Sequence, residues 1–547
     1  MKIPKWSAPA LMVLALTLAI TPRLAAGTNV VEAGPDTTMV DSATVGNSAI
    51  VPAAKPTATP VGSEVPGVTY GIDERFRWQG INNSDFNSAK LDTKRCLLFR
   101  TRPYADININ SYLEVYSRLA WEGTKNTADP SYPKSPTGSV QASPFMAGEM
   151  WIDQAYLKVK KFPGLSHVSL QAGRFDIFKG EGFIFGDGSA LDTSRDVYFN
   201  AFDLAYTANR SKIELIGIYD PKYDFFAVAN RQPIVDASNP SNQGSIKGAV
   251  ASLAQSGRQL NEWDEAALGA YYTNRDFKNT DFDAYTFFKK DYADIRLNTN
   301  YLYLPDRHYT VVGGRFVHRP PQLSGFSITG EFAYEVGTED SMTASAANLD
   351  IRAWGGYGYA KKKFKTKYSP YVIAGFWALS GQDPESKTVG DFDPVFSRWP
   401  NNSPSGEGPF WSEFYGYGLT PERGIAYWTN MKMAKTEAGF TPWKPVTFVF
   451  GYSHMNAMQP FSVNPYHAVG SIKPAAATAG IFGNGLGRGQ LLDGRLVYRV
   501  NKNIQGYFNM EKFLPGDFYT VRDSGYWYRF DITYRYKGFV PFSKSKG

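Results

Sequence analysis

The chain has 547 residues and a formal charge of +7. Lys2, Lys5 and Arg23 lie in a leading stretch without acids, so the remainder carries +4, a bias too weak to indicate a partner. Aromatic residues make up 15% of the chain, yet the mean hydropathy is −0.34. The single cysteine, Cys96, excludes a disulfide framework and any zinc or haem site built on cysteines.

The N-terminus has the order of a secretory signal peptide. Two lysines precede an apolar stretch at residues 8–20, and small residues end at Ala26. The apolar stretch is too short to span a bilayer, so we expect cleavage near Ala26, with a buried N-terminal helix as the alternative. Residues 27–67 are rich in Ala, Thr, Val, Ser and Pro without periodicity, and we expect a flexible periplasmic leader.

From residue 68 onward the sequence alternates with period two, which predicts β-strands. In the first strand Val68, Tyr70 and Ile72 share one face with Phe76 and Trp78, while Asp73, Arg75 and Arg77 share the other. Glu74 interrupts the apolar face. Similar alternation recurs through the chain to Tyr536, and no second long apolar run exists, which excludes membrane-spanning helices.

The connections between the predicted strands alternate between short and long. The short ones are 110–111, 161–165, 209–211, 361–367, 441–445 and 501–503, and the long ones are 123–148, 176–195, 221–262, 381–421 and 456–486. A soluble sandwich has no reason to keep this alternation. We therefore predict an all-β fold: a transmembrane, antiparallel, up-and-down β-barrel of about 18 strands over residues 68–536, with short periplasmic turns, long extracellular loops and a C-terminal extension at 537–547.

The strand alternation also predicts which charged side chains face the barrel interior. If the last strand closes on the first, nine bases fall on five neighbouring strands together with five acids. The bases are Arg75, Arg77, Arg100, Arg102, Arg118, Lys158, Lys160, Arg529 and Arg535, and the acids are Asp73, Asp106, Glu114, Glu122 and Asp531. Such an arc favours anions in a narrow pore. The same residues could instead form a structural ladder of ion pairs, and both interpretations stay open.

Two features of the long connection at 381–421 could bind ligands. Its aromatic residues could stack on sugar rings or pack into the barrel mouth; they are Phe410, Trp411, Phe414, Tyr415 and Tyr417. Asp383, Asp391 and Asp393 could bind a cation, but their spacing matches no defined loop and a solvated acidic loop is the alternative.

Motifs for catalysis are missing from the sequence. None of the five histidines has HExxH spacing, and no complete nucleophile elbow or phosphate loop occurs. We expect no enzyme, no catalytic residue, no metal site and no cofactor.

Several short segments resemble the alginate-export family of outer-membrane barrels. They are Glu74–Asn83 (ERFRWQGINN), Leu98–Asn110 (LFRTRPYADININ), Asp153–Gly188 and Ser380–Pro400. The end, WYRFDITYRY, resembles a closing strand recognised by barrel-assembly machinery, but eleven residues follow it. The resemblance implies an 18-stranded monomeric barrel with an arginine-rich pore. It does not imply alginate as the substrate, because members of the family differ in substrate.

Three functions remain open at this point, all in the outer membrane of a Gram-negative bacterium. The first is a loop-gated channel for small anionic or saccharide solutes. The second is export of an anionic polysaccharide, and the third is a scaffold that sheaths a partner such as a cytochrome, or an adhesin. The expected partners are outer-membrane lipids, the barrel-assembly machinery and the solute, with no nucleic acid.

Overall fold

The fold is taken from a computed structural model. It describes residues 65–84, 86–89, 93–128, 146–186, 199–224, 226–229, 258–259, 264–293, 306–341, 348–383, 385–397, 412, 414, 429–461 and 482–542. The predicted signal peptide and almost all of the predicted leader lie outside these residues. In the described part of the chain, no helix is long and apolar enough to cross a membrane.

The described elements are β-strands. Their bounds are β1 Gly67–Asn82, β2 Lys94–Asn108, β3 Leu113–Ala128, β4 Met146–Val159, β5 Val168–Phe175, β6 Phe199–Ala208, β7 Ser211–Asp220, β8 Tyr223–Asp224, β9 Ala227–Ala229, β10 Arg258–Gln259, β11 Asp264–Asn274, β12 Thr280–Tyr292, β13 Arg307–His318, β14 Phe326–Glu339, β15 Leu349–Lys363, β16 Tyr371–Leu379, β17 Met431–Trp443, β18 Val446–Asn456, β19 Gly487–Arg499, β20 Ile504–Pro515 and β21 Gly525–Pro541.

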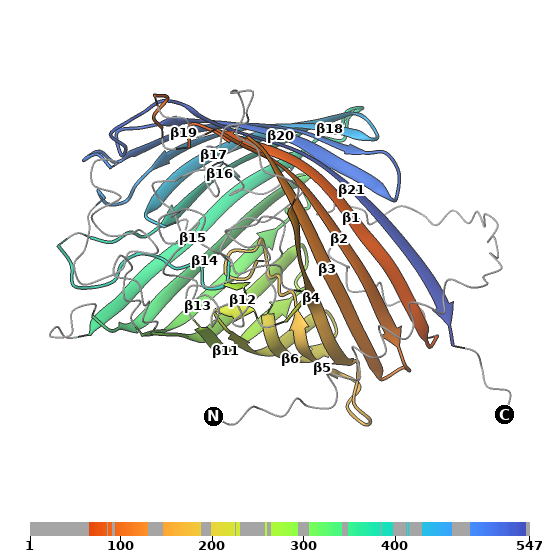
Figure 1. The fold of residues 1–547 in the computed structure, drawn as a ribbon. Coiled ribbons are helices and arrows are strands. Elements are labelled where there is room, and N and C mark those ends of the chain that lie inside the picture. The colour runs from red at the N-terminus through yellow and green to blue at the C-terminus, as the bar shows by residue number, and fades with distance from the viewer. Residues whose placement is uncertain are drawn as a thin grey trace, which may run out of the picture.

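The strands form one closed antiparallel barrel (Figure 1). The sheet has 19 strands, and one of them, the three-residue β9, is an addition that pairs with β4, which leaves 18 strands in the barrel wall. Each wall strand pairs with its neighbours in the chain, β7 pairs with β11, and β21 closes on β1 from Asn82↔Tyr526 to Gly67↔Pro541. This confirms the predicted fold class and the predicted strand number. β21 continues to Pro541, so the strand includes five residues (537–541) that we expected in the extension.

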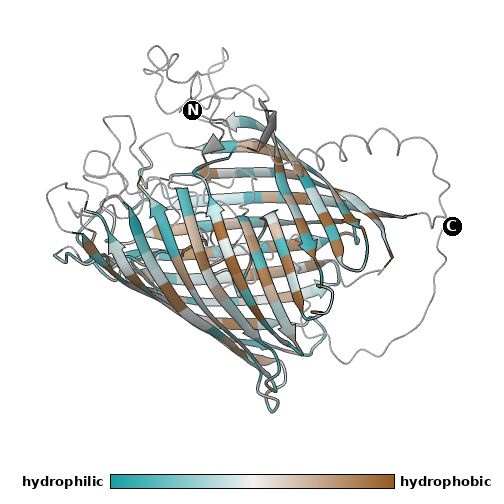
Figure 2. Ribbon diagram, turned by 90° about the horizontal axis from the view of Figure 1, so that it is seen from below, coloured by the Kyte–Doolittle hydropathy of each residue, from teal (hydrophilic) through white to brown (hydrophobic). Residues whose placement is uncertain are grey.

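The two faces of the wall differ in polarity because successive side chains of a strand point to opposite sides. Large apolar side chains on the outer face are exposed, among them Leu268, Val312, Phe332, Phe376 and Phe450. Charged side chains of the wall strands are buried on the inner face, among them Glu265, Arg315 and Glu331, and Figure 2 shows polar and apolar residues alternating along the strands. Glu74, the exception in the first strand, faces outward and accepts a hydrogen bond of 2.7 Å from the Thr101 hydroxyl.

The two ends of the barrel also differ. One end, here the turn end, carries the short connections and both termini of the wall, and the other, here the loop end, carries the long connections. At the loop end Ser88 links the connections beside the β21–β1 closure by donating hydrogen bonds to Asp523 from its hydroxyl (2.6 Å) and its backbone N–H (2.9 Å). These hydrogen bonds hold the pKa of the Asp523 carboxyl below its ordinary value.

Candidate functional site

The nine predicted bases lie in one sector of the barrel wall. Arg529 and Arg535 lie on β21, and the others follow on β1, β2, β3 and β4, with Lys160 directly after β4. We call this sector the basic wall. Its central side chains are buried on the inner face: Arg77, Arg100, Arg102, Arg118 and Arg529 are each no more than 6% exposed.

The basic wall is held together by shared carboxylates. Asp73 accepts from Arg535 at 2.8 Å, from Arg100 at 3.3 Å and from Arg102 at 3.4 Å. Arg77 donates to Asp531 across the β1–β21 closure at 2.8 Å. Because the partners come from adjacent strands, the ladder of ion pairs that we considered is present, and it holds the same arginines that would face a solute.

Two acids of the basic wall were missed by the sequence analysis. Asp153 pairs with Arg118 and lies 3.9 Å from Arg102, and Asp176 lies 3.6 Å from Arg118. The pairing of β3 with β4 shifts register between Arg118 and Leu119, so strict alternation fails there. With these two acids the sector has nine bases and seven acids, and its excess falls from four charges to two.

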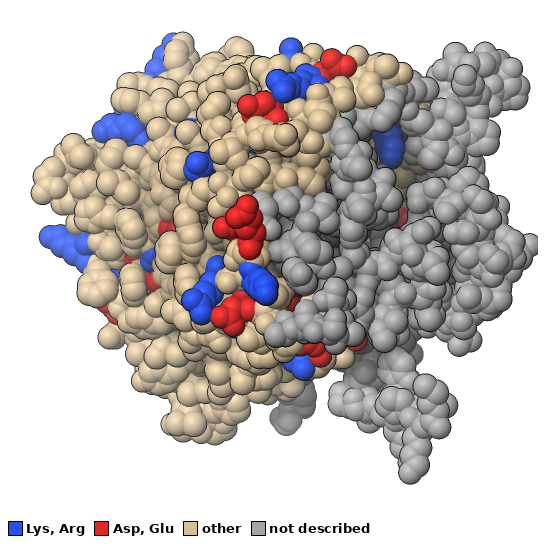
Figure 3. All heavy atoms as spheres, turned by 90° about the vertical axis from the view of Figure 1, so that its left-hand side faces the viewer, with Lys and Arg blue, Asp and Glu red and all other residues tan. Residues whose placement is uncertain are grey.

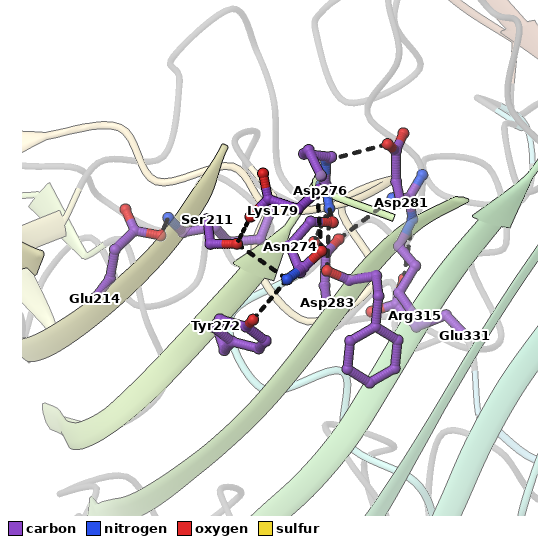
Figure 4. A network of polar contacts seen from close by, with 12 residues as sticks. Lys179, Ser211, Glu214, Tyr272, Asn274, Asp276, Asp281, Asp283, Arg315 and Glu331 are labelled. Carbon is purple, nitrogen blue, oxygen red and sulfur yellow. Dashed lines mark hydrogen bonds and ion pairs between the residues drawn. The ribbon is translucent and has the colours of Figure 1, made fainter. Parts of the chain in front are cut away.

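The opposite part of the wall, over β11 to β15, has a different arrangement (Figure 4). Arg315 lies 2.8 Å from Glu181, 3.3 Å from Asp283 and 3.9 Å from Glu331. Glu331 also accepts hydrogen bonds from the hydroxyls of Tyr357 (2.8 Å) and Tyr285 (3.1 Å). We call this sector the acidic wall, because one guanidinium group there faces three carboxylates.

Glu181 does not belong to a strand; it comes from a segment that follows β5 and enters the barrel. This first inward segment, 177–186, also brings Lys179 to Glu214 on β7 at 2.6 Å. The second inward segment, 388–397, follows β16 and is fixed by Lys289, whose ammonium donates to the Val395 carbonyl at 3.0 Å. The acidic wall therefore binds segments that belong to the connections at the loop end.

The two inward segments pack on each other through aromatic rings. Phe185 stacks on Phe396 with centroids 5.3 Å apart, and the backbones form a parallel bridge at the same residues. Phe183 stacks on Phe392 at 5.3 Å, and Phe185 meets Phe287 of β12 edge-on at 4.9 Å. Phe183 and Phe185 are at most 1% exposed, so an apolar core lies inside the barrel and narrows its lumen.

Of the five aromatic residues suggested as sugar contacts, Phe414 lies within the described residues. Phe414 is fully buried and packs against Phe513 at 5.6 Å and Phe86 at 6.2 Å. Its backbone N–H donates to Glu511 at 3.0 Å. Phe414 is therefore a packing residue and not an accessible saccharide contact. Phe410, Trp411, Tyr415 and Tyr417 lie outside the described residues.

The suggested cation ligands have protein partners as well. Asp393 pairs with Arg307, and Asp391 accepts a hydrogen bond of 2.8 Å from the backbone N–H of Gln382. Over the described ranges, no group of three or more His, Cys, Asp and Glu residues could hold a metal ion. The carboxylates of this connection therefore pair with residues far away in the chain or in the same loop. A single sequence does not reveal such pairs.

Comparisons with known proteins find similarity in solved structures alone. No protein-family model matches the chain, and no curated protein matches it significantly, so the resemblance to the alginate-export family stays a prediction.

The solved structures that match include proteins of two bacteria, among them the outer membrane protein OpdK. OpdK of Pseudomonas aeruginosa, solved with vanillate, is 11% identical with a TM-score of 0.47, over 86% of this chain and 99% of that one. OccK5 (OpdH) of the same bacterium is 10% identical with a TM-score of 0.47, over 87% and 100%. OccAB2 of Acinetobacter baumannii is 11% identical with a TM-score of 0.48, over 87% and 99%.

Proposed function

We propose that this chain is a channel of the Gram-negative outer membrane, and that the channel prefers small anionic solutes. The observation that carries the proposal is the polarity of one closed wall, whose strands expose large apolar side chains outward and bury charged side chains inward. Lipid solvates the first face, and a wet lumen suits the second. Each of the 18 described wall strands is paired on both sides, so the wall itself has no edge strand, as a membrane requires.

The membrane orientation follows from the two ends. Outer-membrane barrels have short periplasmic turns and long external loops. The turn end, with the first residues of β1 and the last of β21, then faces the periplasm. The loop end, from which the inward segments enter, then faces the cell exterior, in line with the predicted signal peptide.

The preference for anions rests on the basic wall. It keeps two more bases than acids on the inner face, where the dielectric is lower than in bulk water and an excess charge acts over a longer range. The inward segments narrow the lumen, which brings a passing solute closer to that charge. The same segments are the candidate gate, because they arise from the connections and not from the wall.

Single-channel recording in a planar bilayer with a salt gradient tests the proposal. The native protein should give discrete conductance steps with a reversal potential on the anion side. The R100Q/R102Q variant should move that potential toward the cation side, because it removes two positive charges from the basic wall.

The matched control is R275Q/R319Q, which removes two charges beside β11 and β13, outside the basic wall. An equal shift of the reversal potential in both variants would mean that the net charge of the protein, and not the basic wall, sets the ion preference. Absence of any step from a barrel shown to be folded by circular dichroism would contradict the channel and favour a scaffold around a partner.

A further inference from the structure

Three neighbouring turns at the turn end, together with the strand ends that adjoin them, form a continuous basic surface. They are residues 361–370, 441–445 and 499–503, and they contain eight bases and no acid. We call this surface the basic rim. Its bases are Lys361, Lys362, Lys363, Lys365, Lys367, Lys444, Arg499 and Lys502.

Backbone hydrogen bonds place the three turns side by side. Thr441 N–H donates to the Tyr368 carbonyl at 2.8 Å, which joins the first turn to the second. Arg499 N–H donates to the Pro445 carbonyl at 2.7 Å, which joins the second to the third. The charges of the three turns therefore add up on one surface instead of being scattered around the barrel.

Three lysines of the basic rim contact neutral groups. Lys362 donates to the Ser324 carbonyl at 2.8 Å, Lys367 lies 5.3 Å from the ring centroid of Tyr368, and Lys361 lies 4.9 Å from that of Tyr371. Carbonyl groups and aromatic rings are neutral, so these three contacts orient the ammonium groups without bringing a negative charge to them.

The remaining turns at the same end show the contrast. Arg275 lies 2.7 Å from Asp283, and Lys160 lies 3.4 Å from Glu114. Arg319 lies 2.9 Å from Asp281. At the other end of the barrel, the described surface in Figure 3 shows blue and red side chains side by side. The basic rim differs from these turns because its three ranges contain eight bases and no acid.

We propose that the basic rim is a docking surface for an acidic protein at the periplasmic mouth; its location rests on the orientation given under the proposed function. The rim spans the ends of six strands, about 25 Å at ~4.8 Å for each strand spacing, which is wide for a small solute and suits a protein face. Phe364, Tyr368 and Trp443 are exposed in the same turns and add the aromatic contact area that protein interfaces favour.

Binding of poly-L-glutamate to the full chain tests the proposal, with the protein in nanodiscs of zwitterionic phosphatidylcholine. The K365Q/K444Q/K502Q variant removes one exposed base from each turn of the rim. We expect it to bind the probe roughly tenfold more weakly at low salt, since exposed ion pairs are individually weak. For the native protein, binding should weaken steeply between low and physiological salt.

The matched control is K161Q/R210Q/K278Q, which removes one base from each of three turns in the rest of the same end. It should change the affinity by no more than about twofold. Equal losses in both variants, or no loss in the first, would overturn the proposal.

Two further readouts separate the alternatives. If the rim instead contacts lipid headgroups, probe binding survives in the rim variant, while the thermal stabilisation given by added anionic phosphatidylglycerol is lost; that result also overturns the proposal. Conductance is recorded in parallel. Conductance steps without probe binding would contradict the docking surface alone. Probe binding without conductance steps would contradict the channel alone.

Discussion

The two charged walls of the lumen are built with opposite ratios. On the basic wall one carboxylate, Asp73, is shared by three arginines. On the acidic wall one arginine, Arg315, is shared by three carboxylates. Each shared group offsets the repulsion among the charges around it, so it contributes more to stability than any one of its partners does.

The walls also differ in where the partners come from. Asp73 lies on β1, and its three arginines lie on the two strands that pair with β1, namely β2 and β21. In contrast, Glu181 reaches Arg315 from an inward segment 134 residues away in the chain. The basic wall therefore stiffens the barrel itself. The acidic wall additionally fixes what lies inside the barrel.

Removing the shared arginine should have the largest effect on this comparison. R315A removes the cation that Asp283, Glu331 and Glu181 share. Asp283 keeps its ion pair with Arg275 at 2.7 Å, whereas the contacts described for the nearly fully buried Glu331 are then with the neutral hydroxyls of Tyr357 and Tyr285. We expect a loss of about 3–5 kcal/mol in the free energy of unfolding, as for other broken buried pairs. Guanidinium unfolding in detergent measures it, with R315K as the variant that keeps the charge. An unchanged midpoint would mean that the three acids do not depend on Arg315.

Releasing the inward segments should have the second largest effect. F185A removes a fully buried ring that contacts Phe396, Phe287 and Phe199, at a cost of about 3 kcal/mol to the docking of the segments. Single-channel conductance should rise and become noisier because the lumen widens. F76A on the outer face, where Phe76 meets Phe99, is the control of the same size. Equal conductance in both variants would show that the segments do not restrict the path.

Removing one of several arginines should have the smallest effect. R100Q leaves Asp73 with Arg102 and Arg535, so we expect a loss of about 1 kcal/mol or less. The same unfolding experiment applies, with D73N as the comparison, because that variant removes the shared group and should cost more. A loss for R100Q as large as for R315A would refute the difference between the two walls.

Much of the wall was predictable from the sequence, because alternation is a local property of a strand and needs no knowledge of its partner. The inner positions of Arg100, Arg102 and Arg529 follow from this alternation. The lengths of the connections between strands are a separate feature that the sequence also shows. Residues 361–367 were equally readable as a short connection, although β15 extends through Lys363.

The contact partners of the inner charged residues and of the connections were decided by the tertiary structure alone. A register shift between β3 and β4 places Asp153 beside Arg118, and such an irregularity leaves no mark in a period-two pattern. The inward segments, the burial of Phe414 and the joining of three basic turns depend on contacts between residues far apart in the chain. Local stereochemistry lets a single sequence specify which face of a strand each side chain takes. Strand pairing and barrel closure decide which side chains then come into contact.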